Sequence, residues 1–190
     1  VAEAFQMAAL KKLPILYLVQ DNEWDISAHA SEVRAVDATH YAKGFGLKTY
    51  TIDGTDFTKS YHTIQNAFLE IREKRTPILI HAKVPLLNHH TSGVRMEWYR
   101  DDLEEARNRD PLPKLKAELL ANGFTKQDLI EIENEAKKTV LSDYQKAVKA
   151  EDPNPEDLFS HDYAPTLILE EKGDREPKEK EPTVMVDSAL

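Results

Sequence analysis

A short apolar run that ends in an acidic and an amide side chain is the feature that most constrains the fold. Residues 13–19, LPILYLV, carry no charge, and Gln20, Asp21 and Asn22 follow them directly. Seven such residues are too few to span a bilayer, but they are typical of a central strand of a parallel sheet, covered on both faces. Ligands of open α/β sheets bind beyond the carboxyl ends of the strands, which is where Asp21 and Asn22 lie. The sequence therefore predicts a ligand-binding turn here.

The side chains of this turn leave two interpretations open. The Asn22 amide oxygen and the Asp21 carboxylate are hard ligands that suit Mg²⁺ or Ca²⁺, and the turn also frees backbone carbonyl oxygens. The same residue types form ordinary turns, and from spacing alone that explanation is the more frequent one.

Residues 1–122 alternate between predicted helices and predicted strands. A helix is already under way at Val1 and ends before Pro14, because proline disfavours helical backbone in the residue before it. Further helices are predicted over 38–44, 57–74 and 111–122, strands over 48–52 and 78–84, and a loop over 26–37. Asp56 is the predicted cap of the helix over 57–74. This order indicates an α/β fold, a parallel sheet flanked by helices.

Apolar spacing also predicts which side of each helix is buried. Ala4, Met7, Ala8 and Leu10 form the expected buried stripe of the first helix. Tyr61, Ile64, Phe68 and Ile71 form that of the helix over 57–74.

Residues beyond 122 change in character. Thr125 and Asp128 form a predicted capping box that opens a long amphipathic helix ending near Lys149. Its apolar face is predicted to contain Leu129, Ile132, Ala136, Val140 and Ala147. We expect a helical extension over 123–165, a flexible linker over 166–182, where Glu, Lys and Pro are dense, and the start of another domain at 183–190.

Composition excludes several classes of function. The net charge of −9 and the lack of any Lys/Arg cluster argue against nucleic acid as a partner. The chain has no Cys, which excludes disulfides, thiolate zinc sites and a cysteine nucleophile, and fits a cytoplasmic location. The apolar runs are all well short of about 20 residues, so a membrane partner is not expected.

Two separated motifs resemble those of a known family. Residues 1–27 resemble the second half of the thiamine diphosphate motif, which closes here at Asp21-Asn22. Residues 88–93, NHHTSG, followed by Trp98-Tyr99-Arg100 and Asp110-Pro111, resemble the phosphate-binding loop of the α subunit of 2-oxo acid dehydrogenases. The resemblance runs to about residue 120 and more loosely to 165.

This resemblance implies a thiamine-diphosphate-binding fold whose N-terminal part is missing, because the family's Gly-Asp-Gly would precede Val1. It also implies that Asn22 and the backbone carbonyl of Trp24 hold Mg²⁺ against the diphosphate of the cofactor. Trp24 replaces the family's usual Tyr, a tolerable change if only the carbonyl is used. Ile26 is expected to pack against the cofactor, although periodicity alone favours a plain core residue.

By the same resemblance His90, rather than His89, touches the diphosphate and assists acyl transfer. The other histidines show no motif spacing and are expected to have no special role: His29, His40, His62, His81 and His161. Thr91 and Ser92 lie where mitochondrial relatives carry regulatory phosphorylation sites. The acidic residues that follow them in the family are replaced here, so we predict that these sites are unused.

The implied enzyme is the first, decarboxylating component of a 2-oxo acid dehydrogenase complex. It would decarboxylate pyruvate or a branched-chain 2-oxo acid and pass the acyl group to the lipoyl group of a dihydrolipoyl acyltransferase. A β-subunit-type domain, fused after residue 182, is the expected partner, in a dimer or a heterotetramer-like assembly. Two alternatives stay open: a transketolase-like transfer of two-carbon units, and a truncated domain that is inactive alone.

Overall fold

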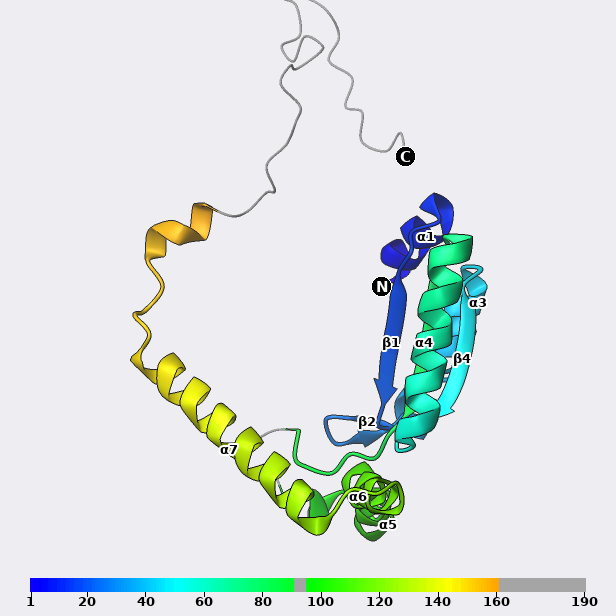
Figure 1. Ribbon diagram of the computed structural model, residues 1–190. Coiled ribbons are helices and arrows are strands. Elements are labelled where there is room, and N and C mark those ends of the chain that lie inside the picture. The colour runs from blue at the N-terminus through cyan, green and yellow to red at the C-terminus, as the bar shows by residue number, and fades with distance from the viewer. Residues whose placement is uncertain (91–94, 161–190) are drawn as a thin grey trace, which may run out of the picture. The chain divides into compact units, whose positions relative to one another are not determined.

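The computed structural model describes residues 1–90 and 95–160 and divides into two compact units, Val1–Ala136 and Lys137–Leu190. The first unit contains a three-stranded parallel sheet (Figure 1). Its strands are β1 (Leu16–Asp21), β5 (Ile78–Lys83) and β4 (Lys48–Asp53), in that spatial order. The predicted parallel sheet flanked by helices is confirmed.

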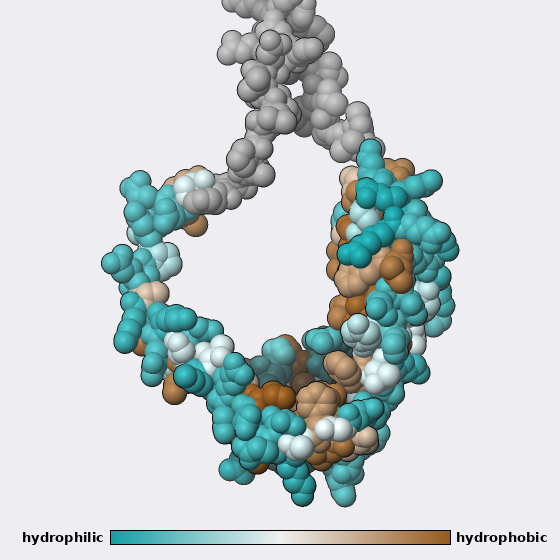
Figure 2. Space-filling view, in the orientation of Figure 1, coloured by the Kyte–Doolittle hydropathy of each residue, from teal (hydrophilic) through white to brown (hydrophobic). Residues whose placement is uncertain are grey.

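The central strand is β5, not β1 as expected. Every residue of β5 except Lys83 is buried, whereas Leu18 of β1 is 48% exposed. Among the described residues β1 pairs on one side only, with β5, and hydrophobic residues reach the surface along this edge (Figure 2). Within the described residues β1 is therefore an edge strand that is only partly buried, so the apolar run 13–19 did not predict its place in this sheet.

Helices cover both faces of the sheet. On one face, α4 (Phe57–Lys74) packs against β4 and β5. This core cluster contains Ile52, Ala67, Ile71, Ile78, Ile80 and Ala82. On the other face lie α1 (Ala2–Lys11) and α3 (Ala38–Gly44), with a second cluster of Phe5, Ala42, Leu47 and Leu79. Because side chains alternate along a strand, His81 points to the face of α1 and α3.

The helix boundaries follow from capping residues in the sequence. Asp56 accepts a hydrogen bond from Lys59 N at the start of α4, as predicted. Asp37 accepts bonds from two backbone amides at the start of α3. α3 ends at Gly44, and Gly46, two residues further on, takes the left-handed conformation at φ 81°.

The buried faces of two helices match the prediction only in part: Ala8 and Ile71 are buried as predicted. α1 buries Phe5 and Ala8, whereas Ala4, Met7 and Leu10 are exposed. Likewise, α4 buries Ala67 and Ile71, whereas Tyr61 and Phe68 are exposed. In both helices the most fully buried residue is an alanine, Ala8 or Ala67, and a small side chain lets a helix approach its neighbours closely.

Residues 26–37 are not a simple loop. Strands β2 (Trp24–Asp25) and β3 (Ala28–His29) form a small antiparallel hairpin. A short helix, α2 (Ala30–Val33), follows. The side chain of Glu32 accepts a bond from His29 N, and His29 Nδ1 accepts one from Ser31 N, so the helix begins with a capping box. Histidine is an unusual capping residue, which is why the sequence did not predict this helix.

The C-terminal half is helical. Its elements are η1 (Met96–Trp98), α5 (Leu103–Asn108), α6 (Pro111–Ala121), α7 (Lys126–Lys149) and η2 (Pro155–Phe159). Thr125 and Asp128 exchange the predicted capping-box hydrogen bonds at the start of α7. Ile132 and Val140, on its predicted apolar face, are exposed.

Several predictions fall on residues that the structure does not describe. These are the phosphorylation positions Thr91 and Ser92, the linker over 166–182 and the domain start at 183–190, and the domain boundaries stay predictions. Within residues 1–90 and 95–160, no helix is both long enough and apolar enough to cross a bilayer.

Candidate functional site

Two overlapping turns follow directly after β1. Asp21 Oδ1 accepts a 3.0 Å hydrogen bond from Glu23 N, and Asn22 Oδ1 accepts a 3.0 Å bond from Trp24 N. Glu23 lies in the left-handed region at φ 64°, which is uncommon for a residue with a side chain. Asn22 is thus a turn residue, as the simpler interpretation predicted. An amide oxygen has two lone pairs, so this bond leaves one for a ligand.

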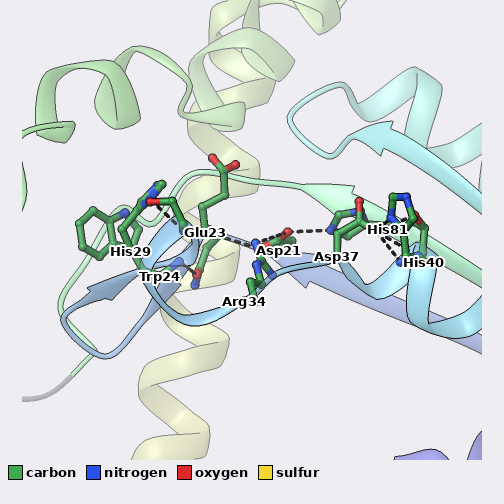
Figure 3. Close-up of polar contacts among 11 residues, drawn as sticks. Asp21, Glu23, Trp24, His29, Arg34, Asp37, His40 and His81 are labelled. Carbon is green, nitrogen blue, oxygen red and sulfur yellow. Dashed lines mark hydrogen bonds and ion pairs between the residues drawn. The ribbon is translucent and has the colours of Figure 1, made fainter.

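The Asp21 carboxylate is buried and has three kinds of partner (Figure 3). Arg34 Nη2 lies 2.8 Å from each of its oxygens, and His81 Nε2 lies 2.7 Å from Oδ2. Burial by itself would raise the pKa of Asp21, but the hydrogen bonds from Arg34, Glu23 N and His81 outweigh it and lower the pKa below its usual range. The carboxylate is therefore ionised and fixed.

The side chain of Trp24 is also held in place. Its Nε1 donates a 3.2 Å hydrogen bond to Asp102 Oδ2, and the guanidinium of Arg100 lies 5.0 Å from the centre of its ring. Arg100 in turn donates to both oxygens of Asp102, at 2.8 and 2.9 Å, and to the carbonyl of Leu86. These bonds from Arg100, opposed by partial burial, lower the pKa of Asp102. The indole of Trp24 therefore has partners of its own, and the role of its carbonyl as a metal ligand stays a prediction.

A cavity of about 110 Å³ lies beside Asn22. Its lining consists of Asn22, Glu23, His29, Val84, Pro85, Leu86, Asp102, Glu105, Ala106 and Arg109. Arg100 neutralises the charge of Asp102. The other charged side chains of the lining are the carboxylates of Glu23 and Glu105 and one guanidinium, that of Arg109. The volume suits a hydrated ion or one phosphate group, because whole small-molecule ligands occupy about 300–1,000 Å³.

A larger, open hollow of about 630 Å³ shares His29 and Asp102 with this cavity. Trp24, Tyr99 and the 73%-exposed Trp98 form much of its wall. The two spaces together place the turn after β1 at a concave surface.

The donors present fit a hard cation but do not complete its coordination. Among residues 1–90 and 95–160, no group of three or more carboxylate, imidazole or thiol side chains is placed to hold a metal ion. Asn22 and the carbonyl of Trp24 offer neutral oxygens instead. Since Mg²⁺ usually keeps several waters or phosphate oxygens as ligands, two protein oxygens are compatible with it.

The predicted site residues are only partly brought together. Asn22 and Trp24 share one turn. Ile26 is exposed at the tip of the β2–β3 hairpin, at φ 56°, a strained conformation for a β-branched residue. His89 and His90 are exposed in the segment after β5, and the described residues that line the small cavity do not include His90.

Sequence reasoning missed the roles of two buried groups next to the site. His81 was expected to have no special role, yet it is fully buried and bonded to Asp21. The available signal was a polar residue inside the otherwise apolar run 78–82, because a buried polar side chain requires a partner. Arg100 belongs to the Trp98-Tyr99-Arg100 motif, but its contact with Trp24 joins distant segments that no local pattern connects.

Comparison with known proteins supports the resemblance noted from the motifs. The family model described as "Dehydrogenase E1 component" matches residues 1–156. Relatives include the pyruvate dehydrogenase E1 component subunit alpha of Rickettsia bellii, 27% identical over 166 residues, which cover 86% of this chain and 51% of that protein. The 3-methyl-2-oxobutanoate dehydrogenase subunit alpha of Mycobacterium tuberculosis is 32% identical over 168 residues, 86% of this chain and 46% of that protein.

A third relative is the mitochondrial 2-oxoisovalerate dehydrogenase subunit alpha 2 of Arabidopsis thaliana, 29% identical over 180 residues, 89% of this chain and 37% of that protein. The chain spans about half the length of the first curated relatives it matches. With the family model matching most of its length, the chain belongs to the dehydrogenase E1 component family.

Proposed function

We propose that this chain is the α-type part of an enzyme that decarboxylates a 2-oxo acid, pyruvate or a branched-chain analogue, and transfers the acyl group to the lipoyl group of a dihydrolipoyl acyltransferase. The observation that carries the proposal is the Asn22–Trp24 turn, which opens onto a small cavity at the carboxyl edge of the sheet in a chain of this family. Ligands of open α/β sheets bind at that edge.

Asn22 and the carbonyl of Trp24 would hold Mg²⁺ there, and the metal would bind the diphosphate of thiamine diphosphate. The hard oxygen donors and the excess of carboxylates around the cavity both favour a cation. When bound, thiamine diphosphate supplies the electron sink that decarboxylation needs. Arg109 would add positive charge on the phosphate side, since guanidinium groups pair well with phosphate oxygens.

Ile26 and His90 would act at the rim of this site. Ile26 offers an exposed apolar side chain next to the metal-binding turn, which could cover the cofactor. His90 is exposed, and an imidazole can hydrogen-bond a phosphate oxygen or transfer a proton. The fused β-type domain and the cytoplasmic location stay predictions.

Metal binding tests the core of the proposal. In the full-length protein with its partner chain, Mg²⁺ is titrated by calorimetry in the presence of excess thiamine diphosphate. Asn22→Ala should weaken Mg²⁺ at least about tenfold, because it removes one oxygen ligand from a site with few alternatives. Asn134→Ala is the matched control, since Asn134 is exposed on α7. Equal affinities in the wild type and Asn22→Ala would contradict the metal assignment.

The role of His90 is tested by separating two activities. His90→Ala should reduce lipoyl-dependent turnover by about 10²–10⁴-fold, the usual contribution of a general acid–base group, while decarboxylation with an artificial electron acceptor falls less. His89→Ala and the exposed His62→Ala are the controls. Full lipoyl-dependent activity in His90→Ala would remove His90 from the mechanism. Turnover of ketose phosphates without turnover of 2-oxo acids would support the transketolase-like alternative instead.

A further inference from the structure

The segment between β1 and α3 begins and ends beside one buried histidine, which is hydrogen-bonded at the β1 end. His81 Nε2 lies 2.7 Å from Asp21 Oδ2, at the end of β1, and His81 Nδ1 lies 3.9 Å from Asp37 Oδ2, at the start of α3 (Figure 3). Since an ionised carboxylate only accepts hydrogen bonds, Nε2 carries the hydrogen that joins His81 to Asp21. Residues 22–36, which include the proposed metal-binding turn, thus begin and end beside the same side chain.

Arg34 provides a second anchor for the same carboxylate. It lies near the end of this segment, and its Nη2 contacts both oxygens of Asp21. Arg34, His81 and the backbone N of Glu23 together bond both carboxylate oxygens of Asp21, a residue that is only 7% exposed. The Asp21 carboxylate therefore cannot rotate without breaking a charged hydrogen bond in a buried place.

The position of that carboxylate decides the shape of the turn. Asp21 Oδ1 holds Glu23 N and so stabilises the left-handed conformation of Glu23. The Asn22 amide and the carbonyl of Trp24 lie on either side of that residue. The Glu23 backbone sets how these two residues are oriented relative to one another, because the peptide planes on either side of Glu23 join it to Asn22 and to Trp24.

We propose that Asp21, fixed by Arg34 and His81, is the positioning group that aims the oxygens of Asn22 and Trp24 at the divalent cation. This inference rests on the proposed function, which makes those oxygens metal ligands. Side chains that orient metal ligands without touching the metal typically change metal affinity by 10–100-fold when they are replaced. A purely structural ion pair would instead change thermal stability and leave the affinity of the folded protein unaltered.

The test is the Mg²⁺ affinity of the full-length protein with its partner chain, measured by calorimetry with excess thiamine diphosphate. Arg34→Gln should weaken Mg²⁺ by about 10-fold or more, and Arg34→Lys should recover part of the loss because it restores a donor and the charge. Asp21→Asn should lose less affinity than Asp21→Ala, since the amide keeps an acceptor for Glu23 N. The KM for the 2-oxo acid should change little in the Arg34 variants.

Glu70→Gln is the matched control. It removes the two ion pairs that Glu70 of α4 makes with Lys48 and Lys74, on the face of the sheet opposite His81. It should therefore lower stability without changing Mg²⁺ affinity. Arg34 is partly exposed, which keeps its variants informative if Asp21→Ala does not fold. Wild-type Mg²⁺ affinity in folded Arg34→Gln, with Asn22→Ala impaired, would overturn this inference alone. Wild-type affinity in Asn22→Ala would instead overturn the proposed metal site.

Discussion

Trp24 Nε1 donates a 3.2 Å hydrogen bond to Asp102 Oδ2 and so joins two residues that are 78 positions apart. The bond connects the turn after β1 to the start of α5. Arg100 strengthens the connection, because it binds Asp102 through two donors and also contacts the ring of Trp24. The Trp24 side chain therefore stabilises the wall of the cavity beside Asn22 as well as its own turn.

Trp24→Phe should lower the free energy of unfolding by about 1.5 kcal/mol, because it keeps an aromatic ring under Arg100 but removes a donor to a charged acceptor. The measurement is chemical denaturation followed by circular dichroism. Trp98→Phe is the control, since Trp98 is largely exposed, and it should change the free energy by less than about 0.5 kcal/mol. Equal effects in the two variants would mean that the Asp102 bond contributes nothing.

Gly54→Ala should destabilise the protein by about 1–3 kcal/mol through overpacking. A Cβ at this position would lie 2.6 Å from Val84 Cγ1 and 3.1 Å from the carbonyl oxygen of Lys83. The double variant Gly54→Ala/Val84→Ala should recover part of the loss, because it removes the nearest clashing atom. Gly44→Ala meets open space in α3 and should be neutral or stabilising by up to about 1 kcal/mol. Thermal midpoints of the variants would check the order.

Glu70 should make the protein more sensitive to acid. Hydrogen bonds from Lys48, then Lys74, lower its pKa from 4.5 to about 2, against a small opposing effect of burial. A carboxylate whose pKa is lower in the folded state contributes stability above its unfolded pKa, and that contribution disappears as the pH falls from about 4.5 towards 2. Glu70→Gln should therefore lower the free energy of unfolding by about 1 kcal/mol at pH 7 and by less at pH 3.

Denaturation curves of the wild type and Glu70→Gln at several pH values test this prediction. The difference should also shrink in 1 M salt, because surface ion pairs are screened. At pH 7 the exposed neighbour Glu73→Gln serves as control and should change stability by less than about 0.5 kcal/mol. A Glu70→Gln difference that does not vary with pH would show that its charge is not involved.

Asp37→Ala should cost about 1–2 kcal/mol, because the Asp37 carboxylate caps α3 with bonds from Thr39 N and His40 N and also binds both of those side chains. Asp56→Ala, which removes one capping bond from the start of α4, should cost less. Thermal denaturation of the two variants provides the comparison. A larger loss at Asp56 would contradict the view that the extra bonds of Asp37 matter.

Local patterns predicted the individual elements of this fold well. The helix over 57–74 has the predicted bounds, and its cap at Asp56 is confirmed. The capping box at Thr125 and Asp128 is also confirmed. Such features depend on residues within four positions of one another, so the sequence contains the whole of the interaction. The order of strands and helices then indicated the α/β class.

Patterns were less informative about which apolar face each helix buries. Of the stripe predicted on α4, Ile71 is buried and Ile64 packs against the core, whereas Tyr61 and Phe68 are exposed and Ala67 is buried instead. An amphipathic helix can present more than one apolar stripe, and the sheet it packs on decides between them. Likewise, the apolar run before Asp21 did not reveal that β5, rather than β1, is the central strand, because the pairing of the strands decides their order.

The sequence by itself determined the fold class, the turn at Asp21-Asn22 and, through its motifs, the family. Only the tertiary structure decided how that turn is held. His81 and Arg34 meet at the Asp21 carboxylate, and Arg100 and Asp102 meet at Trp24, from segments far apart along the chain. Local spacing reports nearest neighbours in one helix or strand, whereas these contacts exist only because a parallel sheet brings the carboxyl ends of its strands to one edge.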